Sequence, residues 1–296
     1  MELILENFPL PAEFAEMDNL IMGVKKNIKK ESENINILKL IFNCIDLTSL
    51  NTTDSSDTIT TFVEKVNSFA GSYPDMPEVA AVCVFPVFAP VLKSTLKRDG
   101  VKKAVVSAGF PSSQTFTDVK KLETKRAIEF GANEIDIVLS VGEFLEGNYD
   151  FVYEEVVAIK DVMKEIHLKV ILETGALKTA EQIWMASLLS MEAGADFIKT
   201  STGKMQPAAT SEAFYVMARA VKAYHQKTGK KVGLKAAGGI STAKEVLIYY
   251  GIVNDVLGND WLNNNLFRIG ASRLANNLLN DIISIEKGER EEVKFF

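Results

Sequence analysis

Short apolar segments rich in β-branched residues recur along this sequence, and segments with the pattern of helices separate most of them. The recurring unit is roughly 25 to 40 residues long, which is the length of one strand followed by one helix. Most of the segments are nearly continuous apolar runs, as expected for parallel strands that helices cover. They are KLIFNCIDL, VAAVCVFP, KAVVSAGFP, EIDIVLSV, LKVILET, DFIKTS, VGLKAAGG and LFRIGAS. Helices are predicted between them, among others over 116–131, 149–166, 179–194 and 211–224.

Eight successive strand–helix units in about 260 residues predict a (β/α)8 TIM barrel, an α/β fold. A doubly wound open sheet is the alternative, but it usually carries a glycine fingerprint after its first strand, and CIDLTSLN has none. We expect a helical extension over 1–37 with one helix at 11–36, then the barrel over 38–282 and a charged tail over 283–296. The catalytic groups of such barrels lie at the carboxyl ends of the strands, so polar residues there are the candidates.

Composition excludes several classes of function. A net charge of −6 argues against a general surface for polyanions, so no nucleic-acid partner is expected. The longest apolar run is interrupted by two prolines, so no membrane span is expected, and the amino terminus lacks the order of a signal peptide. Cys44 and Cys83 are too few for a disulfide framework, which favours a cytoplasmic setting. His167 and His225 lie far apart and form no zinc motif. A metal held by carboxylates is left open, but side-chain chemistry is favoured, so no metal or other cofactor is expected.

Two lysines stand inside predicted strands, where lysine is rarely found. Lys199 lies in DFIKTS and Lys235 in VGLKAAGG, and these strands would be neighbours in a barrel. Burial and a second cation both disfavour protonation, and burial alone shifts the pKa of a lysine by up to ~3–5 units. A lysine in this setting is partly a free amine, which can attack a carbonyl group and form a Schiff base.

Two carboxylates come from other predicted strands. Asp136 lies between two isoleucines in EIDIVLS, where a carboxylate is costly unless a cation or a hydrogen bond compensates it. Asp46, in CIDLTSLN, could equally be a turn or capping residue. A purely structural interpretation pairs Lys199 with Asp136 and Lys235 with Asp46. Residue chemistry alone leaves this interpretation and the catalytic one open.

Glycines follow the last three predicted strands, in Thr202-Gly203-Lys204, Gly238-Gly239 and Gly270-Ala271-Ser272. Glycine lets backbone N–H groups approach a ligand closely, and a helix amino terminus behind it favours an anion. In barrels the phosphate site is frequently built from the loops after strands seven and eight. The pattern therefore suggests a small phosphorylated carbonyl compound, with its phosphate at the glycines and its carbonyl at Lys199 or Lys235.

Five motifs together, DFIKTSTGK, GLKAAGG, FRIGAS, IDLTSLN and EIDIVLS, resemble those of the deoxyribose-phosphate aldolase family, class I aldolases of barrel fold. The resemblance covers residues 38–279 and keeps the order and spacing of the motifs. It implies reversible cleavage of 2-deoxy-D-ribose 5-phosphate to D-glyceraldehyde 3-phosphate and acetaldehyde, as in deoxyribonucleotide catabolism. It also implies a homo-oligomer, a dimer or a tetramer.

The resemblance assigns roles to individual positions. Lys199 matches the lysine that forms the Schiff base, and Lys235 matches the second lysine, which perturbs the first and helps to move protons. Asp136 matches the aspartate that handles protons with an ordered water, and Asp46 matches the aspartate that supports the second lysine. The implied substrate-binding positions are Cys83, which the chemistry does not require, and Thr202, Gly203, Lys204, Gly238, Gly239, Ser241, Gly270, Ser272 and Arg273.

The chain departs from the family pattern at three places. Ala236 replaces the proline of the second lysine motif, a minor change. Ser241 stands where many members have a phosphate-binding arginine, and Arg273 from the adjacent loop could supply the missing charge. Some members end in a tyrosine that aids proton transfer, whereas this chain ends in Lys294-Phe295-Phe296.

Other functions fit parts of the pattern. One is a Schiff-base aldolase acting on a different phosphosugar, and another is a barrel isomerase or synthase without a covalent lysine. A third is a phosphosugar sensor in which the lysines only pair with carboxylates. Trapping of an acetaldehyde adduct on Lys199 separates these alternatives.

Overall fold

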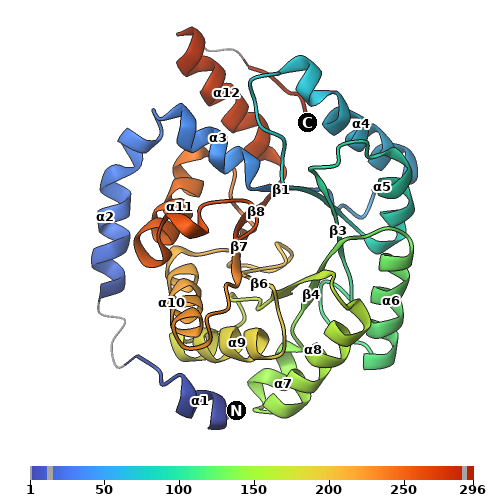
Figure 1. Ribbon diagram of the computed structural model, residues 1–296, viewed down its shortest axis with the longest axis vertical. Helices are drawn as coiled ribbons and strands as arrows, with labels where there is room; N and C mark the ends of the chain where they lie inside the picture. Colours follow the sequence, from blue (N-terminus) through green and yellow to red (C-terminus); the bar gives the residue numbers. More distant parts are fainter. Residues whose placement is uncertain (1, 12–15, 289–291) are drawn as a thin grey trace.

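A closed barrel of parallel strands forms the centre of the computed structural model, which describes residues 2–11, 16–288 and 292–296 (Figure 1). The strands follow one another in chain order, and the last pairs with the first. They are β1 (Ile45–Thr48), β2 (Ala81–Val84), β3 (Lys102–Val106), β4 (Glu134–Val138), β5 (His167–Ile171), β6 (Phe197–Lys199), β7 (Gly233–Ala237) and β8 (Phe267–Ala271). The predicted (β/α)8 barrel is therefore confirmed.

Helices form the outer ring around the strands (Figure 1). They are α4 (Ser56–Ser72), α5 (Ala89–Thr95), α6 (Thr117–Glu129), α8 (Tyr149–Met163), α9 (Ala180–Glu192), α10 (Ser211–Thr228), α11 (Ala243–Leu257) and α12 (Arg273–Lys287). Three shorter elements join them, namely η1 (Pro86–Phe88), α7 (Val141–Leu145) and η2 (Asn259–Trp261). Thr179, Thr210 and Thr242 start α9, α10 and α11 by accepting a hydrogen bond from a backbone N–H of the first turn.

The amino-terminal part differs from the single helix expected over 11–36. The structure has α1 (Glu2–Asn7), α2 (Glu16–Glu31) and α3 (Ile35–Asn43), while residues 12–15 of the expected helix lie outside the described residues. The side chain of Asn34 accepts hydrogen bonds from two N–H groups of α3 and so begins a new helix. Helix α2 packs on α11 and α10, outside the ring (Figure 1).

The first strand is shorter than the segment KLIFNCIDL suggested. Residues 39–43 belong to α3, and β1 begins only at Ile45. Leu38, Ile41 and Phe42 are all buried, and their spacing of three and four residues is that of one helix face. The predicted strand is wrong at this position because a continuous apolar run fits a buried helix as well as a strand.

The carboxyl-terminal segment returns along α12. Asn276 and Asn280 of α12 hydrogen-bond the backbone of Val293, Phe295 and Phe296. The expected boundaries at residues 37 and 282 fall inside α3 and α12. Within the part of the chain that the structure describes, no helix has the length and apolarity to cross a bilayer.

The interior of the barrel has two unlike sides. On β4 the outward-facing Ile135 and Ile137 are buried beneath helices, and Glu134 and Asp136, which alternate with them, face inward. On β2 and β3 the inward residues are small and apolar, and they form a separate cluster with Leu50: Ala81, Cys83, Ala104 and Val106. The other strands carry charged residues inward. The polar side of the barrel is thus held against an apolar wall.

Candidate active site

Lys199 ends β6 and Lys235 lies in the middle of β7, and the two are register partners in the parallel pair. Register partners point to the same side of a sheet, so both side chains enter the barrel. Lys199 is 4% exposed and Lys235 is fully buried. The structure therefore brings together the two lysines that the sequence singled out, with Lys199 nearer the mouth.

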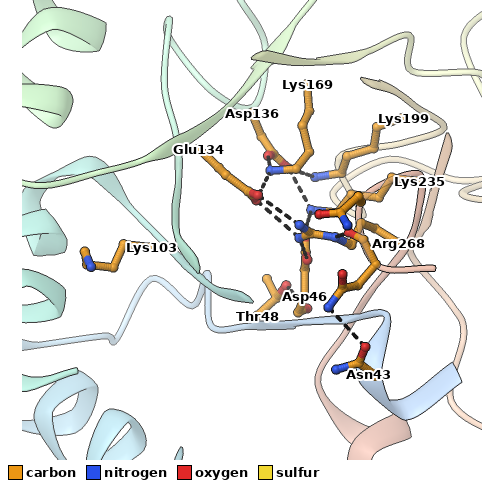
Figure 2. A network of polar contacts seen from close by, with 12 residues as sticks. Asn43, Asp46, Thr48, Lys103, Glu134, Asp136, Lys169, Lys199, Lys235 and Arg268 are labelled. Carbon is orange, nitrogen blue, oxygen red and sulfur yellow. Dashed lines mark hydrogen bonds and ion pairs between the residues drawn. The ribbon is translucent and has the colours of Figure 1, made fainter. Parts of the chain in front are cut away.

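Asp136 of β4 faces both of these lysines (Figure 2). Its Oδ2 accepts hydrogen bonds from Lys199 Nζ at 2.9 Å and Lys235 Nζ at 2.8 Å. Lys235 Nζ also lies 2.5 Å from Oδ2 of Asp46 in β1. The two separate ion pairs considered from the sequence are thus joined through one carboxylate.

Three further charged residues, not singled out in the sequence, complete the cluster (Figure 2). Lys169 of β5 lies 2.7 Å from Glu134 and 3.0 Å from Asp136. Arg268 of β8 lies 2.6 Å from Asp46 and 2.9 Å from Glu134. The usable signal was a charged residue inside an apolar strand: Glu134 stands two positions before Asp136, and Lys169 and Arg268 interrupt LKVILET and LFRIGAS.

The two lysines differ in their affinity for a proton. Burial lowers the pKa of Lys199, Asp136 opposes this effect, and Lys235 lowers the pKa further, so that it lies below its ordinary value. Burial also acts to lower the pKa of Lys235, but Asp136 and Asp46 outweigh burial and raise it. Lys235 is consequently a stable ammonium, and Lys199 is the lysine closest to a free amine.

The carboxylates are ionised. Burial acts to raise the pKa of Asp136, but Lys169, Lys199 and Lys235 hold it well below the usual range. The pKa of Asp46 is lowered in the same way, with Lys235 and Arg268 outweighing burial. Both groups therefore act as acceptors toward the lysines at neutral pH.

Cys83 lies on the apolar wall of the barrel. Burial and the nearby Asp136 raise the pKa of its thiol to about 11. A thiol in that state is a small apolar side chain rather than a nucleophile at neutral pH.

The glycines after β6 and β7 bring two loops into contact. Gly203 and Gly238 have φ values of +78° and +89°, a region that favours glycine. A Cβ on Gly238 would lie 3.1 Å from the Cα of Gly203 and 2.6 Å from the Cβ of Ala208. Gly238 and Gly239 also line a cavity of about 360 Å³ with residues 206–212. These loops present backbone groups to the mouth of the barrel.

Gly270, on β8, lies close to Lys235 inside the barrel. A Cβ at Gly270 would lie 3.2 Å from Cε of Lys235 and 2.9 Å from the Cβ of Ala237. The missing side chain therefore leaves room for Lys235 to cross toward Asp46.

Thr202 and Lys204 tie the loop after β6 to its neighbours. The Thr202 hydroxyl donates to Glu173 at 2.5 Å, and Lys204 N donates to the Thr202 hydroxyl at 3.0 Å. Lys204 Nζ donates to the Leu50 carbonyl, in the loop after β1, at 2.5 Å. Lys204 is an exposed cation that crosses the mouth of the barrel.

Ser241, Ser272 and Arg273 lie at the starts of α11 and α12. The backbone N–H and the hydroxyl of Ser241 both donate to Glu245, at 2.8 and 3.2 Å. A carboxylate thus takes both donors of Ser241. Ser272 and Arg273 are exposed, and Arg273 lines the groove between α11, α12 and the carboxyl-terminal segment.

The arrangement supports one kind of chemistry above others. An amine of lowered pKa, adjacent to an ionised carboxylate and at the carboxyl end of a barrel strand, can add to a carbonyl carbon. The glycine loops and Lys204 surround the same mouth and can bind an anionic group.

Comparisons with known proteins agree with this chemistry. Residues 40–249 match the family described as DeoC/LacD family aldolase. The chain is 38% identical over 269 residues to the human deoxyribose-phosphate aldolase, covering 86% of this chain and 83% of the human protein. It is 37% identical over 265 residues to the Bos taurus deoxyribose-phosphate aldolase, covering 84% of this chain and 81% of the bovine protein.

The fold also matches solved structures. The tetrameric deoxyribose phosphate aldolase from Aeropyrum pernix aligns with a TM-score of 0.66 at 24% identity, covering 86% of this chain and 97% of that one. At this identity the likeness supports the fold alone. The family match and the relatives above, which align over most of their length, are decisive: the chain belongs to the DeoC/LacD family of aldolases.

Proposed function

We propose that this chain catalyses the reversible cleavage of 2-deoxy-D-ribose 5-phosphate to D-glyceraldehyde 3-phosphate and acetaldehyde through a Schiff base on Lys199. The observation that supports it most is the state of Lys199, a buried amine of lowered pKa at the end of β6. The substrate is inferred from the names of the human and bovine relatives, which are both called deoxyribose-phosphate aldolase.

The covalent step begins with the free amine of Lys199. Its nitrogen attacks the aldehyde carbon C1 of the open-chain sugar, and loss of water leaves a protonated imine. This cation draws electrons from the bond between C2 and C3. When the C3 hydroxyl loses its proton, that bond breaks and D-glyceraldehyde 3-phosphate departs, leaving an enamine on Lys199. Protonation of the enamine at C2 and addition of water then release acetaldehyde and regenerate the amine.

Asp136, acting through a water molecule, is the proton carrier of this proposal. Its Oδ2 lies 2.9 Å from Lys199 Nζ before the reaction. Conversion of Lys199 to an imine leaves that nitrogen with fewer hydrogens to donate, so Oδ2 gains a free lone pair for a water. Lys235, 2.8 Å from the same oxygen, remains to balance the charge and to pass a proton. Asp46 holds Lys235 in place from the opposite side.

The phosphate lies, in this proposal, at the loops after β6, β7 and β8. Lys204 supplies a full charge, and the backbone around Gly203, Gly238 and Gly239 supplies N–H groups. Arg273 adds a second charge, because Ser241 is held by Glu245. An unchanged KM in an Arg273→Ala variant would remove this part of the proposal. Binding the phosphate far from C2 and C3 fixes the orientation of the reacting bond.

A trapping experiment tests the proposed function. The protein is incubated with acetaldehyde, reduced with borohydride and digested, and the modified lysine is located by peptide mass mapping. An ethyl group on Lys199 supports the Schiff base, and its absence would exclude it. Lys103 of β3 is the internal control, because Figure 2 shows this strand lysine apart from the charged cluster. Cleavage of 2-deoxy-D-ribose 5-phosphate is then followed through the glyceraldehyde phosphate released.

We also infer a homo-oligomer located in the cytoplasm. The Aeropyrum pernix protein is described as tetrameric, and Phe116 at the start of α6 and Val119 and Leu122 within it are exposed apolar residues. Both cysteines are free and buried, as is usual in a reducing compartment. Light scattering of the purified protein and cell fractionation test the two inferences.

A further inference from the structure

The charged residues beneath Lys199 form a closed ring in which carboxylates and cations alternate (Figure 2). Each member contacts the next through ion pairs of 2.5 to 3.0 Å, and the last returns to the first. In order, the ring is Asp136, Lys169, Glu134, Arg268, Asp46 and Lys235. All six residues are buried, with at most 2% of their surface exposed. The ring spans five of the eight strands and fills the polar side of the barrel.

Lys199 is attached to this ring without being part of it. Every cation of the ring contacts two carboxylates. Among the residues that the structure describes, Lys199 forms an ion pair with a single oxygen, Asp136 Oδ2, which it shares with Lys235. The ring contains three carboxylates and three cations, so its formal charge is zero without Lys199. Protonation of Lys199 adds one positive charge that no further carboxylate of the ring balances.

We propose that Arg268 and Lys169 are positioning residues that occupy the buried carboxylates, so that Lys199 alone lacks a carboxylate of its own and reacts as a free amine. This inference rests on the proposed function, because it concerns the amine that forms the Schiff base. Arg268 and Lys169 do not touch the substrate in this proposal. They act on the reactivity of Lys199 through the carboxylates that they contact.

The physical reason lies in the cost of an unbalanced charge in a buried site. An isolated charge is strongly disfavoured away from water, so the cluster is most stable when its total charge is zero. One of the four cations must then release its proton. Arg268 cannot, because a guanidinium stays protonated in proteins. Lys169 and Lys235 keep theirs, because two carboxylates raise the pKa of each. Lys199 is left as the group that deprotonates.

The remaining surroundings of Lys199 do not alter this count. Cys83 on the opposite wall is a neutral thiol, and Glu173 after β5 accepts hydrogen bonds from Thr202 at the loop. The titratable groups that act directly on Lys199 are Asp136 of β4, Lys235 of β7 and Cys83 of β2, and the other members of the ring contact Asp136, Lys235 or one another. Lys235 acts on Lys199 directly, whereas Arg268 acts through Asp46 and Glu134.

The test measures how fast acetaldehyde, followed by cyanoborohydride, modifies Lys199 as a function of pH. Acetaldehyde has no phosphate, so its own ionisation does not enter the profile. In an Arg268→Met variant a carboxylate is set free, Lys199 becomes its counter-ion, and the acidic limb of the profile moves up by about one pH unit. The rate at neutral pH then falls roughly tenfold and returns at higher pH. Arg268→Lys, which keeps the charge, is expected to restore the profile of the unaltered protein.

Two further variants guard against a failure to fold. Lys169→Met also removes a cation and is expected to move the acidic limb to higher pH. Glu134→Gln removes a carboxylate at nearly constant volume and is expected to move the acidic limb to lower pH. A purely structural role would reduce the rate at every pH without moving the limb. A limb that stays in place in both cation-removing variants, or that moves up in Glu134→Gln, would overturn the inference. If the unaltered protein forms no adduct on Lys199, the proposed function itself fails.

Discussion

Lys199 and Lys235 share one carboxylate oxygen, Oδ2 of Asp136, at 2.9 and 2.8 Å. Two ammonium groups around one oxygen repel each other, and the group with fewer other partners gives up its proton more easily. Lys235 has Asp46 as a second partner at 2.5 Å. The shared oxygen therefore leaves two lysines of the same chemistry with different pKa values, lowered for Lys199 and raised for Lys235.

Replacing the nucleophile should abolish catalysis. A Lys199→Met variant keeps a side chain of similar length but has no amine, so we expect a loss of cleavage activity of more than about a thousandfold and no acetaldehyde adduct. Circular dichroism should show an intact fold, because the neutral ring beneath Lys199 remains. Lys103→Met is the matched control, since Lys103 lies apart from the cluster (Figure 2), and its activity should be unchanged. Residual adduct formation at another lysine would contradict the assignment.

Replacing the fixed cation should change the pH dependence instead. In wild-type protein Lys235 helps to lower the pKa of Lys199, so the amine is available at lower pH. In Lys235→Met that effect is lost, Lys199 no longer shares Oδ2 of Asp136 with a second ammonium group, and the pKa of Lys199 rises. The acidic limb of the kcat/KM profile is expected about one to three pH units higher, with activity lost at neutral pH and partly regained in alkali. An acidic limb at the original pH would argue against this role of Lys235.

The space around Lys235 makes a further prediction. A Gly270→Ala methyl group would lie 3.2 Å from Lys235 Cε and 2.9 Å from Ala237 Cβ, so Lys235 or its strand must shift. We expect a loss of stability of about 1–3 kcal/mol and a fall in kcat of at least roughly tenfold. Gly71→Ala in α4 is the matched control, because its methyl group would meet nothing within 4 Å. Urea unfolding and steady-state kinetics measure the two effects, and equal behaviour of the two variants would refute the steric argument.

Lys204 offers a way to separate binding from chemistry. Its ammonium group crosses the mouth of the barrel and is exposed, which suits contact with a phosphate. A Lys204→Met variant is expected to raise the KM for 2-deoxy-D-ribose 5-phosphate by roughly 10- to 100-fold, the value of one charge-assisted hydrogen bond. The rate of adduct formation with acetaldehyde, which has no phosphate, should stay within about twofold. Equal losses in both assays would place Lys204 in the chemistry instead.

The carboxyl terminus is predicted to contribute stability rather than catalysis. Phe295 and Phe296 pack against Phe69 with ring centroids 5.3 and 5.1 Å apart, and Asn276 hydrogen-bonds their backbone. Removing these two residues should lower the free energy of unfolding by about 1–3 kcal/mol and leave kcat within about twofold. Denaturant titration and initial rates give both values. A large fall in kcat without loss of stability would show that the terminus acts in proton transfer.

Much of the architecture follows from local patterns in the chain. Eight apolar segments separated by helices predict the barrel, because each segment needs helices to cover it and the spacing repeats. Lys199 and Lys235 stand out in the same way, since a cation inside an apolar strand is costly wherever that strand lies. Helix α3 does not follow from the local pattern. Its segment predicts a strand, because a short, mainly apolar run does not distinguish a helix from a strand.

What the sequence alone determined about this protein is therefore the fold, the family and the two lysines, because these depend on periodicity and on residues next to each other in the chain. Only the tertiary structure decided which groups surround each lysine and so which of the two has the lowered pKa. Closing the barrel brings Glu134, Lys169 and Arg268 from three strands into one ring with Asp46, Asp136 and Lys235. The pKa of Lys199 depends on whether the other cations of the ring already occupy the buried carboxylates. These contacts join residues from different strands, so a local sequence pattern does not predict them.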